Sequence, residues 1–289
     1  MESLNTLFAH FLQERRYIRN ISPKTAIWYE TAWKAFRAGD PADAPLTRLR
    51  LQTFVVRLRD RGVGPTSCNT YVKALNAFAK WLHEEGHSPE RPHLGSLKTP
   101  RRIIKTLDTS ALRAILGFKP RGIRQWRIFA VVATILDTGC RIDELLHAPV
   151  TAFDFDNLLI TVRGKGDKER RVPFSFELRK VLVRYLRHRE SAVPTSLLMF
   201  PSLSGAKWGQ RNALRSYYLV QQRIGLQKSG FHRLRHSFAT EYLRAGGDVV
   251  RLSRVLGHSE ISTTMRYLHL LTEDLQKPHQ SLSILNRLR

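Results

Sequence analysis

The chain has 289 residues, and 48 lysines and arginines against 24 acidic residues give it a formal net charge of +24. This length allows two modest domains, and the charge favours a polyanionic partner, above all nucleic acid, because an isolated chain of this charge repels itself. The longest apolar run, residues 128–136, is too short to span a bilayer and no signal-peptide pattern is visible, so we expect a cytoplasmic protein and not a membrane protein.

Residues 1–97 predict a small bundle of helices. Apolar residues recur at helical spacing in four segments, which are 4–12, a helix opened by Ser22 and Pro23, 49–59 and 66–85. We expect most of their aromatic side chains to form the core. Basic residues on the outer faces are candidates for contacts with DNA phosphates, although solvated surface charges would look the same: Arg57, Arg59, Arg61, Lys73 and Lys80.

Pro and Gly recur between residues 86 and 100, and this stretch leads into a basic linker at 98–106. Its candidate phosphate contacts are Arg101, Arg102 and Lys105. Basic residues outnumber acidic ones on both sides of the linker. The distribution fits two domains that close around a duplex, and it also fits a tether of no special role.

Residues 107–289 predict a second domain. Asp108 or Thr109 is expected to cap a helix that runs through Leu116, and a longer apolar helix covers 126–137. Two β-prone runs flank a Gly-rich basic turn at 163–170, which indicates a β-hairpin whose tip can place a lysine at a phosphate. Four further helical stretches, including 176–189 and 211–224, are expected before residue 231. The predicted fold class is mainly α with a small β-hairpin or sheet.

Residues 231–270 carry the densest chemistry. His232, Arg235 and His236 fall at i, i+3 and i+4, so they share one face of a helix. Two imidazoles beside a guanidinium favour an anion such as phosphate. A zinc site is disfavoured because the neighbouring arginines would repel a divalent cation, so no metal is expected. Helix signals place His258 at a helix end and Tyr267 on the next helix, both within reach of this cluster.

Residues 232–269 resemble box II of the tyrosine recombinases, the phage integrase and Xer-type family. The resemblance lies in three motifs in this order: H-x-L-R-H-S-F-A-T, L-G-H-S-x-I-S-T-T and Y-x-H. T-G-x-R-I-x-E-L-L around Arg141 resembles box I of the same family. There Glu144 lies three residues after Arg141 and can orient its guanidinium, although the pair alone would indicate only a surface ion pair. Asp143 stands where the family usually has a small residue.

The remaining motifs extend the resemblance over the chain. The segment from residue 164, G-K-G-x-K-x-R-x-V-P, resembles the hairpin that carries the family's catalytic lysine. That lysine corresponds to Lys165, and Lys168 is the second candidate. L-x-x-F-x-K-W-L-x-x-x-G, ending at Gly86, resembles the end of the core-binding domain. The implied architecture has a helical, SAM-like core-binding domain at 1–97, the linker at 98–106 and a catalytic domain at 107–289. In relatives the C-terminal tail docks on a neighbouring protomer.

The resemblance also implies a catalytic set, with a supporting pair. The catalytic residues are Arg141, Lys165, His232, Arg235, His258 and the nucleophile Tyr267, and the supporting residues are Glu144 and His236. Tyr267 would attack phosphorus to form a 3′-phosphotyrosyl link. Lys165 would protonate the 5′ oxygen, and His232 would accept a proton or bind the phosphate. Three other tyrosines could act on chemistry alone but lack the spacing from His258: Tyr217, Tyr218 and Tyr242.

These features predict a site-specific DNA recombinase that needs neither metal nor other cofactor. Its expected partner is double-stranded DNA with paired inverted-repeat core sites, bound by a dimer per site and a tetramer in the synapse. One alternative is a DNA-relaxing enzyme similar to type IB topoisomerases, which the separate helical domain disfavours. The other is a non-catalytic sequence-specific DNA-binding protein, which the complete catalytic set disfavours. Dimer resolution, phage integration and transposition, the last a role in a mobile element, all remain open.

Overall fold

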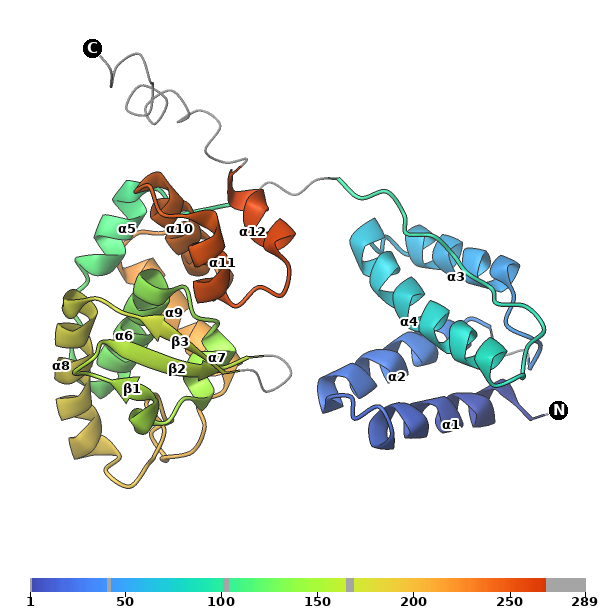
Figure 1. The fold of residues 1–289 in the computed structure, drawn as a ribbon, viewed down its shortest axis with the longest axis horizontal. Helices are drawn as coiled ribbons and strands as arrows, with labels where there is room; N and C mark the ends of the chain where they lie inside the picture. The colour runs from blue at the N-terminus through green and yellow to red at the C-terminus, as the bar shows by residue number, and fades with distance from the viewer. Residues whose placement is uncertain (1, 41–42, 101–103, 165–168, 269–289) are drawn as a thin grey trace, which may run out of the picture. The chain divides into compact units, whose positions relative to one another are not determined.

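The computed structural model describes residues 2–40, 43–100, 104–164 and 169–268. The chain divides into two compact units, residues 1–102 and 103–289, which are described separately below (Figure 1). Of the residues named from the sequence, Arg101, Arg102, Lys165 and Lys168 lie outside the described residues. The C-terminal tail from residue 269 onward also lies outside them. No helix within the described ranges has the length and apolar composition that crossing a membrane requires.

The first unit is a four-helix bundle, as its sequence predicts. Its helices are α1 (Leu4–Tyr17), α2 (Pro23–Arg37), α3 (Arg48–Asp60) and α4 (Pro65–Glu84). The side chains of Ser3, Ser22 and Thr47 cap the first three by accepting a hydrogen bond from a backbone N–H of the first turn. Aromatic rings fill the centre, where Phe8 stacks on Trp33 with centroids 4.8 Å apart. The predicted aromatic core is therefore confirmed.

Two asparagines of α4 hold the segment that follows it. Asn76 donates to Leu94 O at 2.9 Å and accepts from Leu94 N at 3.2 Å. Asn69 donates to Leu97 O at 2.9 Å and accepts from Leu97 N at 2.7 Å. The asparagines are seven residues apart, close to two helical turns, so both lie on one face of α4. The chain therefore stays attached to the first unit as far as Leu97.

Replacing Asn69 and Asn76 together by Ala should release this segment. Four hydrogen bonds are lost, and at about 0.5–1 kcal/mol each the free energy of unfolding of the first unit should fall by about 2–4 kcal/mol. Trypsin should then cut the native full-length protein faster after Lys98, the exposed residue that follows Leu97, and mass spectrometry of the fragments would show this. Lys73→Ala, an exposed change on the same helix, is the control. An unchanged rate of cleavage after Lys98 would contradict the role of the two asparagines.

The second unit is built around a helix that is buried on nearly all sides. Residues 127–135 of α6 (Gly122–Thr138) are all buried, as expected for a helix whose apolar residues go all the way round. Helices α8, α9 and α10 pack against it (Figure 1). The other helices of this unit are α5 (Thr109–Leu116), α7 (Ile142–His147), α8 (Phe176–Ala192), α9 (Gln210–Arg223), α10 (Phe231–Arg244), α11 (Val249–Leu256) and α12 (Ile261–Leu268).

The predicted hairpin is part of a three-stranded antiparallel sheet in the order β1-β2-β3. The strands are β1 (Phe153–Asp154), β2 (Leu159–Arg163) and β3 (Glu169–Pro173). Ile160 pairs with Val172, and both side chains are fully buried. The short strand β1 had not been expected, because two residues carry too little alternation to indicate a strand.

The expectation of four helical stretches between the hairpin and residue 231 is wrong, because that fully described interval contains α8 and α9 alone. Residues 193–209 form turns and isolated bridges, since prolines and glycines interrupt helical hydrogen bonding there. Two buried arginines stabilise this connection. Arg189 donates to Leu198 O at 3.0 Å, and Arg127 donates to Pro201 O at 2.6 Å.

Candidate active site

The junction between α6 and α7 positions the first arginine. Gly139 ends α6 with φ +65°, and a Cβ there would lie 2.4 Å from the Phe238 ring, so glycine is required on two grounds. Arg141 then caps α7 and donates from its backbone N to Glu144 Oε2 at 2.8 Å and from Nη1 to Oε1 at 2.9 Å. Glu144 therefore orients Arg141, as the spacing predicts. Cys140 lies between Gly139 and Arg141 in the chain. Burial raises the pKa of its thiol to about 11, so the thiol is an inert packing group.

Glu144 also binds a second guanidinium, which the sequence did not reveal. Arg170 of β3 donates from Nη1 to Oε1 at 2.8 Å and from Nη2 to Oε2 at 2.9 Å. Burial would raise the pKa of Glu144, but the hydrogen bonds and charges of Arg170 and Arg141 outweigh it and hold the pKa below its ordinary value. Strand alternation could have identified Arg170, because it lies two residues before the buried Val172 and so on the inner face of β3.

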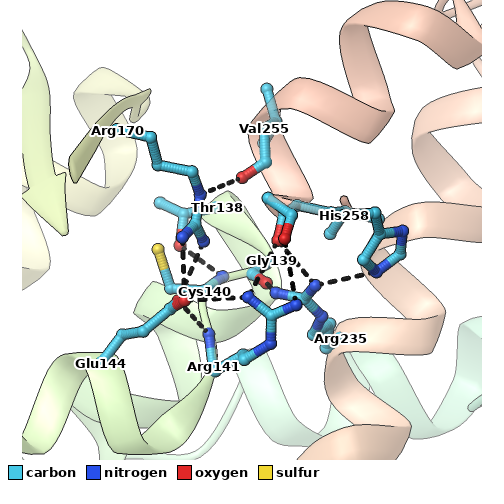
Figure 2. Close-up of polar contacts among 11 residues, drawn as sticks. Thr138, Gly139, Cys140, Arg141, Glu144, Arg170, Arg235, Val255 and His258 are labelled. Carbon is cyan, nitrogen blue, oxygen red and sulfur yellow. Dashed lines mark hydrogen bonds and ion pairs between the residues drawn. The ribbon is translucent and has the colours of Figure 1, made fainter. Parts of the chain in front are cut away.

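The C-terminal end of α11 gathers three arginines (Figure 2). Arg170 donates to Val255 O at 2.9 Å. Arg141 and Arg235 both donate to Leu256 O, at 3.3 and 2.8 Å. Arg141 also donates to Gly257 O at 3.2 Å. The last carbonyls of a helix lack partners within the helix and carry partial negative charge. This helix end therefore brings three guanidinium groups together, and the carboxylate of Glu144 accepts from two of them, Arg141 and Arg170.

Arg235 occupies the buried centre of the site, with 4% of its surface exposed. It donates to Gly139 O at 2.6 Å and lies 3.1 Å from His258 Nε2 (Figure 2). A guanidinium can only donate, so Nε2 accepts and the imidazole proton is on Nδ1, which donates to Thr264 Oγ1 at 2.8 Å. Burial, followed by the charges of Arg235 and Arg141, lowers the pKa of His258 to about 4. His258 is therefore neutral at pH 7, in a tautomer that the buried Thr264 fixes.

Tyr267, on α12, contacts α10, the helix that carries Arg235 and His236. Its side chain is 3% exposed, and its Oη lies 2.8 Å from His236 Nδ1. Burial raises the pKa of Tyr267 above its ordinary value, against the opposing charges of Arg235, Arg266 and Arg141. Burial, followed by the charges of His232 and Arg235, lowers the pKa of His236 to about 4. The hydrogen bond therefore joins a neutral phenol and a neutral imidazole.

His232 lies one turn before His236 on α10, with ring centroids 6.4 Å apart. Its side chain is exposed to solvent, although neighbouring protein atoms crowd the ring. This crowding, followed by the charges of Arg235 and Arg141, lowers the pKa of His232. The structure thus brings together the five described members of the predicted catalytic set: Arg141, His232, Arg235, His258 and Tyr267.

The predicted phosphate contacts outside this cluster differ in their surroundings. Arg61, Lys73 and Lys105 are exposed. Arg59 donates to Val63 O at 2.8 Å, and Lys80 pairs with Glu84 at 3.2 Å. The half-buried Arg57 lies over the Phe54 ring, 5.9 Å from its centroid. Arg61, Lys73 and Lys105 are therefore the best placed of the described candidates to meet a phosphate.

The arrangement suits a monoanionic ester of phosphoric acid. Guanidinium groups bind two oxygens of such an anion at once, and a phenol beside them can attack the phosphorus. No group of three or more His, Cys, Asp or Glu side chains in the described parts of the chain is placed to hold a metal ion. The positive charge of the described site comes from arginines.

Comparisons with known proteins agree with these features. Residues 105–274 match the model of the phage integrase family. The chain is 34% identical over 249 residues to tyrosine recombinase XerD of Brucella melitensis, covering 80% of this chain and 79% of that protein. It is 30% identical over 259 residues to tyrosine recombinase XerC of Salmonella typhi, covering 89% and 84%.

The fold is similar to that of the Tn1549 transposon integrase, with a TM-score of 0.77 at 19% identity, covering 92% of this chain and 95% of that one. At this identity the likeness concerns the fold alone. The family match and the curated relatives favour neither the topoisomerase nor the non-catalytic alternative. The chain belongs to the phage integrase family and is a tyrosine recombinase, an enzyme of site-specific DNA recombination.

Proposed function

We propose that Tyr267 attacks a DNA phosphodiester held by Arg141, Arg235 and His258 and forms a covalent 3′-phosphotyrosyl intermediate. The observation that carries the proposal is the convergence on α10, where Arg235 bonds to His258 and the next residue, His236, bonds to Tyr267. Consecutive helical residues point about 100° apart. One helix can therefore present a phosphate ligand and the attacking tyrosine side by side.

The arginines supply the electrostatic part of the catalysis. Attack by the phenol builds negative charge on the non-bridging phosphate oxygens, and fixed guanidinium groups stabilise that charge without having to reorganise. Glu144, the end of α11 and Gly139 O hold these groups in place before DNA arrives. His258, neutral and accepting from Arg235, would rotate or take up a proton to donate to the phosphate. Lys165 would protonate the leaving 5′ oxygen, a role that rests on the sequence resemblance.

We further propose the larger assembly that the resemblance implies. The core-binding domain at 1–97, the linker at 98–106 and the catalytic domain at 107–289 would enclose a duplex with inverted-repeat core sites, with a dimer per site and a tetramer in the synapse. The net charge of +24 supports contact with DNA phosphates. The structure of the Tn1549 integrase, whose fold is similar, is a complex with circular intermediate DNA.

Covalent trapping on nicked DNA tests the proposal. DNA fragments selected for specific binding to this protein would be nicked near the bound centre, incubated with protein, denatured and examined for a protein–DNA adduct. Wild type and the control Tyr242→Phe should give the adduct, and Tyr267→Phe should give none because it lacks the attacking oxygen.

Two outcomes would contradict this assignment. An adduct that survives in Tyr267→Phe would move the nucleophile to another residue. A wild-type protein that binds the DNA specifically and forms no adduct would be a non-catalytic DNA-binding protein. Plasmid relaxation without recombinant products would instead indicate a topoisomerase-like enzyme.

A further inference from the structure

The geometry points to His236 as the general base that takes the proton of Tyr267 during cleavage, an inference that rests on the proposed role of Tyr267 as nucleophile. The sequence had assigned His232 as the proton acceptor or phosphate ligand and His236 as a supporting residue. In the structure it is His236 whose Nδ1 lies 2.8 Å from Tyr267 Oη. That is hydrogen-bond distance, the first requirement for a general base.

Packing fixes the pair in this orientation. α10 and α12 pack directly against each other, and the rings of His236 and Tyr267 lie with centroids 5.7 Å apart. Tyr267 belongs to a small apolar cluster with Ala239, Leu243 and Leu252, which holds its ring against α10. The bond is therefore made by two side chains on helices that pack together, and not by chance contact at the surface.

The charges around His236 suit a general base that is unprotonated before DNA binds. The groups that face it are His232 and Arg235 on α10, Arg266 and Tyr267 on α12, and His258 after α11. Burial, followed by the charges of His232, Arg235 and Arg266, keeps the imidazole neutral, with a pKa of about 4. The pKa of Tyr267 is raised, so the phenol keeps its proton. The neutral pair is thus one in which the phenol O–H donates to Nδ1, with the imidazole proton on Nε2.

Binding of the phosphodiester would favour transfer of the Tyr267 proton to His236. Its negative charge offsets the arginine charges, and an anion near a histidine raises the pKa of the imidazole. The Tyr267 O–H bond breaks and the proton moves to His236 Nδ1, while the Oη electron pair forms the new bond to phosphorus. The bond from phosphorus to the 5′ oxygen breaks, and that oxygen takes a proton from the proposed acid, Lys165. When a 5′ hydroxyl attacks the intermediate, His236 returns its proton to the departing Tyr267 oxygen.

His236→Asn is the decisive variant. The Asn amide can still hydrogen-bond to Tyr267 near the position of Nδ1 but cannot accept a proton. The single-turnover cleavage rate should fall by about 10²–10⁴-fold, the usual contribution of a general base. The rate of the variant should rise steeply with pH as the phenol ionises in solution, whereas the wild-type rate should be flatter. His188→Asn, on α8 and exposed, is the matched control and should retain the wild-type rate and profile.

A substrate with sulfur in place of the 5′ bridging oxygen separates the base from the acid. A thiol with a pKa of about 8.5 leaves as its anion and needs no proton. Lys165→Ala should therefore regain speed on this substrate, and His236→Asn should stay slow. Added imidazole should partly restore His236→Ala, which covers the case in which the Asn variant does not fold.

Three results would overturn the assignment. These are a wild-type cleavage rate and pH profile in His236→Asn, recovery of His236→Asn on the sulfur substrate, and failure of imidazole to restore a folded His236→Ala. A failure of the proposed function looks different, because either Tyr267→Phe would still form the covalent adduct or the wild-type protein would form none.

Discussion

Arg235→Lys is expected to slow DNA cleavage by about 10³-fold, close to the loss seen when a transition-state donor is removed from a preorganised site. Lysine keeps the charge but not the planar fork, so it cannot contact Gly139 O, Leu256 O and His258 Nε2 together. Burial, followed by the charge of Arg141, lowers the pKa of Arg235 to about 10, so the wild-type guanidinium stays protonated at neutral pH. Geometry is therefore what the substitution removes.

Single-turnover cleavage of nicked DNA would measure this effect, together with DNA affinity at a stated salt concentration. Affinity should change little, because many phosphate contacts contribute to it. Arg233→Lys is the matched control on the same helix, since the Arg233 side chain donates from Nε to Thr106 O at 3.2 Å, away from the contacts of Arg235. A loss below roughly tenfold in Arg235→Lys would show that charge alone suffices and that the fork is not part of transition-state stabilisation.

Glu144→Ala is expected to lower the free energy of unfolding of the second unit by about 3–5 kcal/mol, as when one partner of a buried ion pair is removed. The variant leaves Arg170 and Arg141 without the carboxylate that accepts from both. Denaturant unfolding would measure the loss. Glu169→Ala is the matched control, because its ion pair with Arg163 is exposed and worth about 1 kcal/mol or less.

The effect of Glu144 should depend on pH with a defined sign. The pKa of Glu144 is lower in the folded protein than its ordinary value of 4.5. Its contribution to stability is therefore complete above pH 4.5 and is lost as pH falls through the folded pKa. The difference in stability between wild type and Glu144→Ala should shrink in acid. If the difference in unfolding free energy between wild type and Glu144→Ala stays constant down to about pH 3, Glu144 acts through packing and not through its charge.

Local patterns were enough to predict most helices and much of the candidate site. Helical periodicity and capping residues act within a few positions, so the four helices of the first unit follow from the sequence. The spacing of Arg141 and Glu144 is likewise local, and their hydrogen bond was expected. The helix count before residue 231 was wrong because prolines and glycines interrupt helical hydrogen bonding in residues 193–209, whose carbonyls accept from Arg127 and Arg189 instead.

The sequence by itself determined the family motifs, the basic charge and the residue types of the site, because each is written in contiguous segments. Only the tertiary structure decided that Arg170 shares Glu144 with Arg141, that three arginines meet at the end of α11, and that His236 is the histidine bonded to Tyr267. These hydrogen bonds join residues up to 116 positions apart, as between Arg141 and Gly257. Such contacts depend on how α7, β3, α10, α11 and α12 pack together, and no local periodicity encodes that packing.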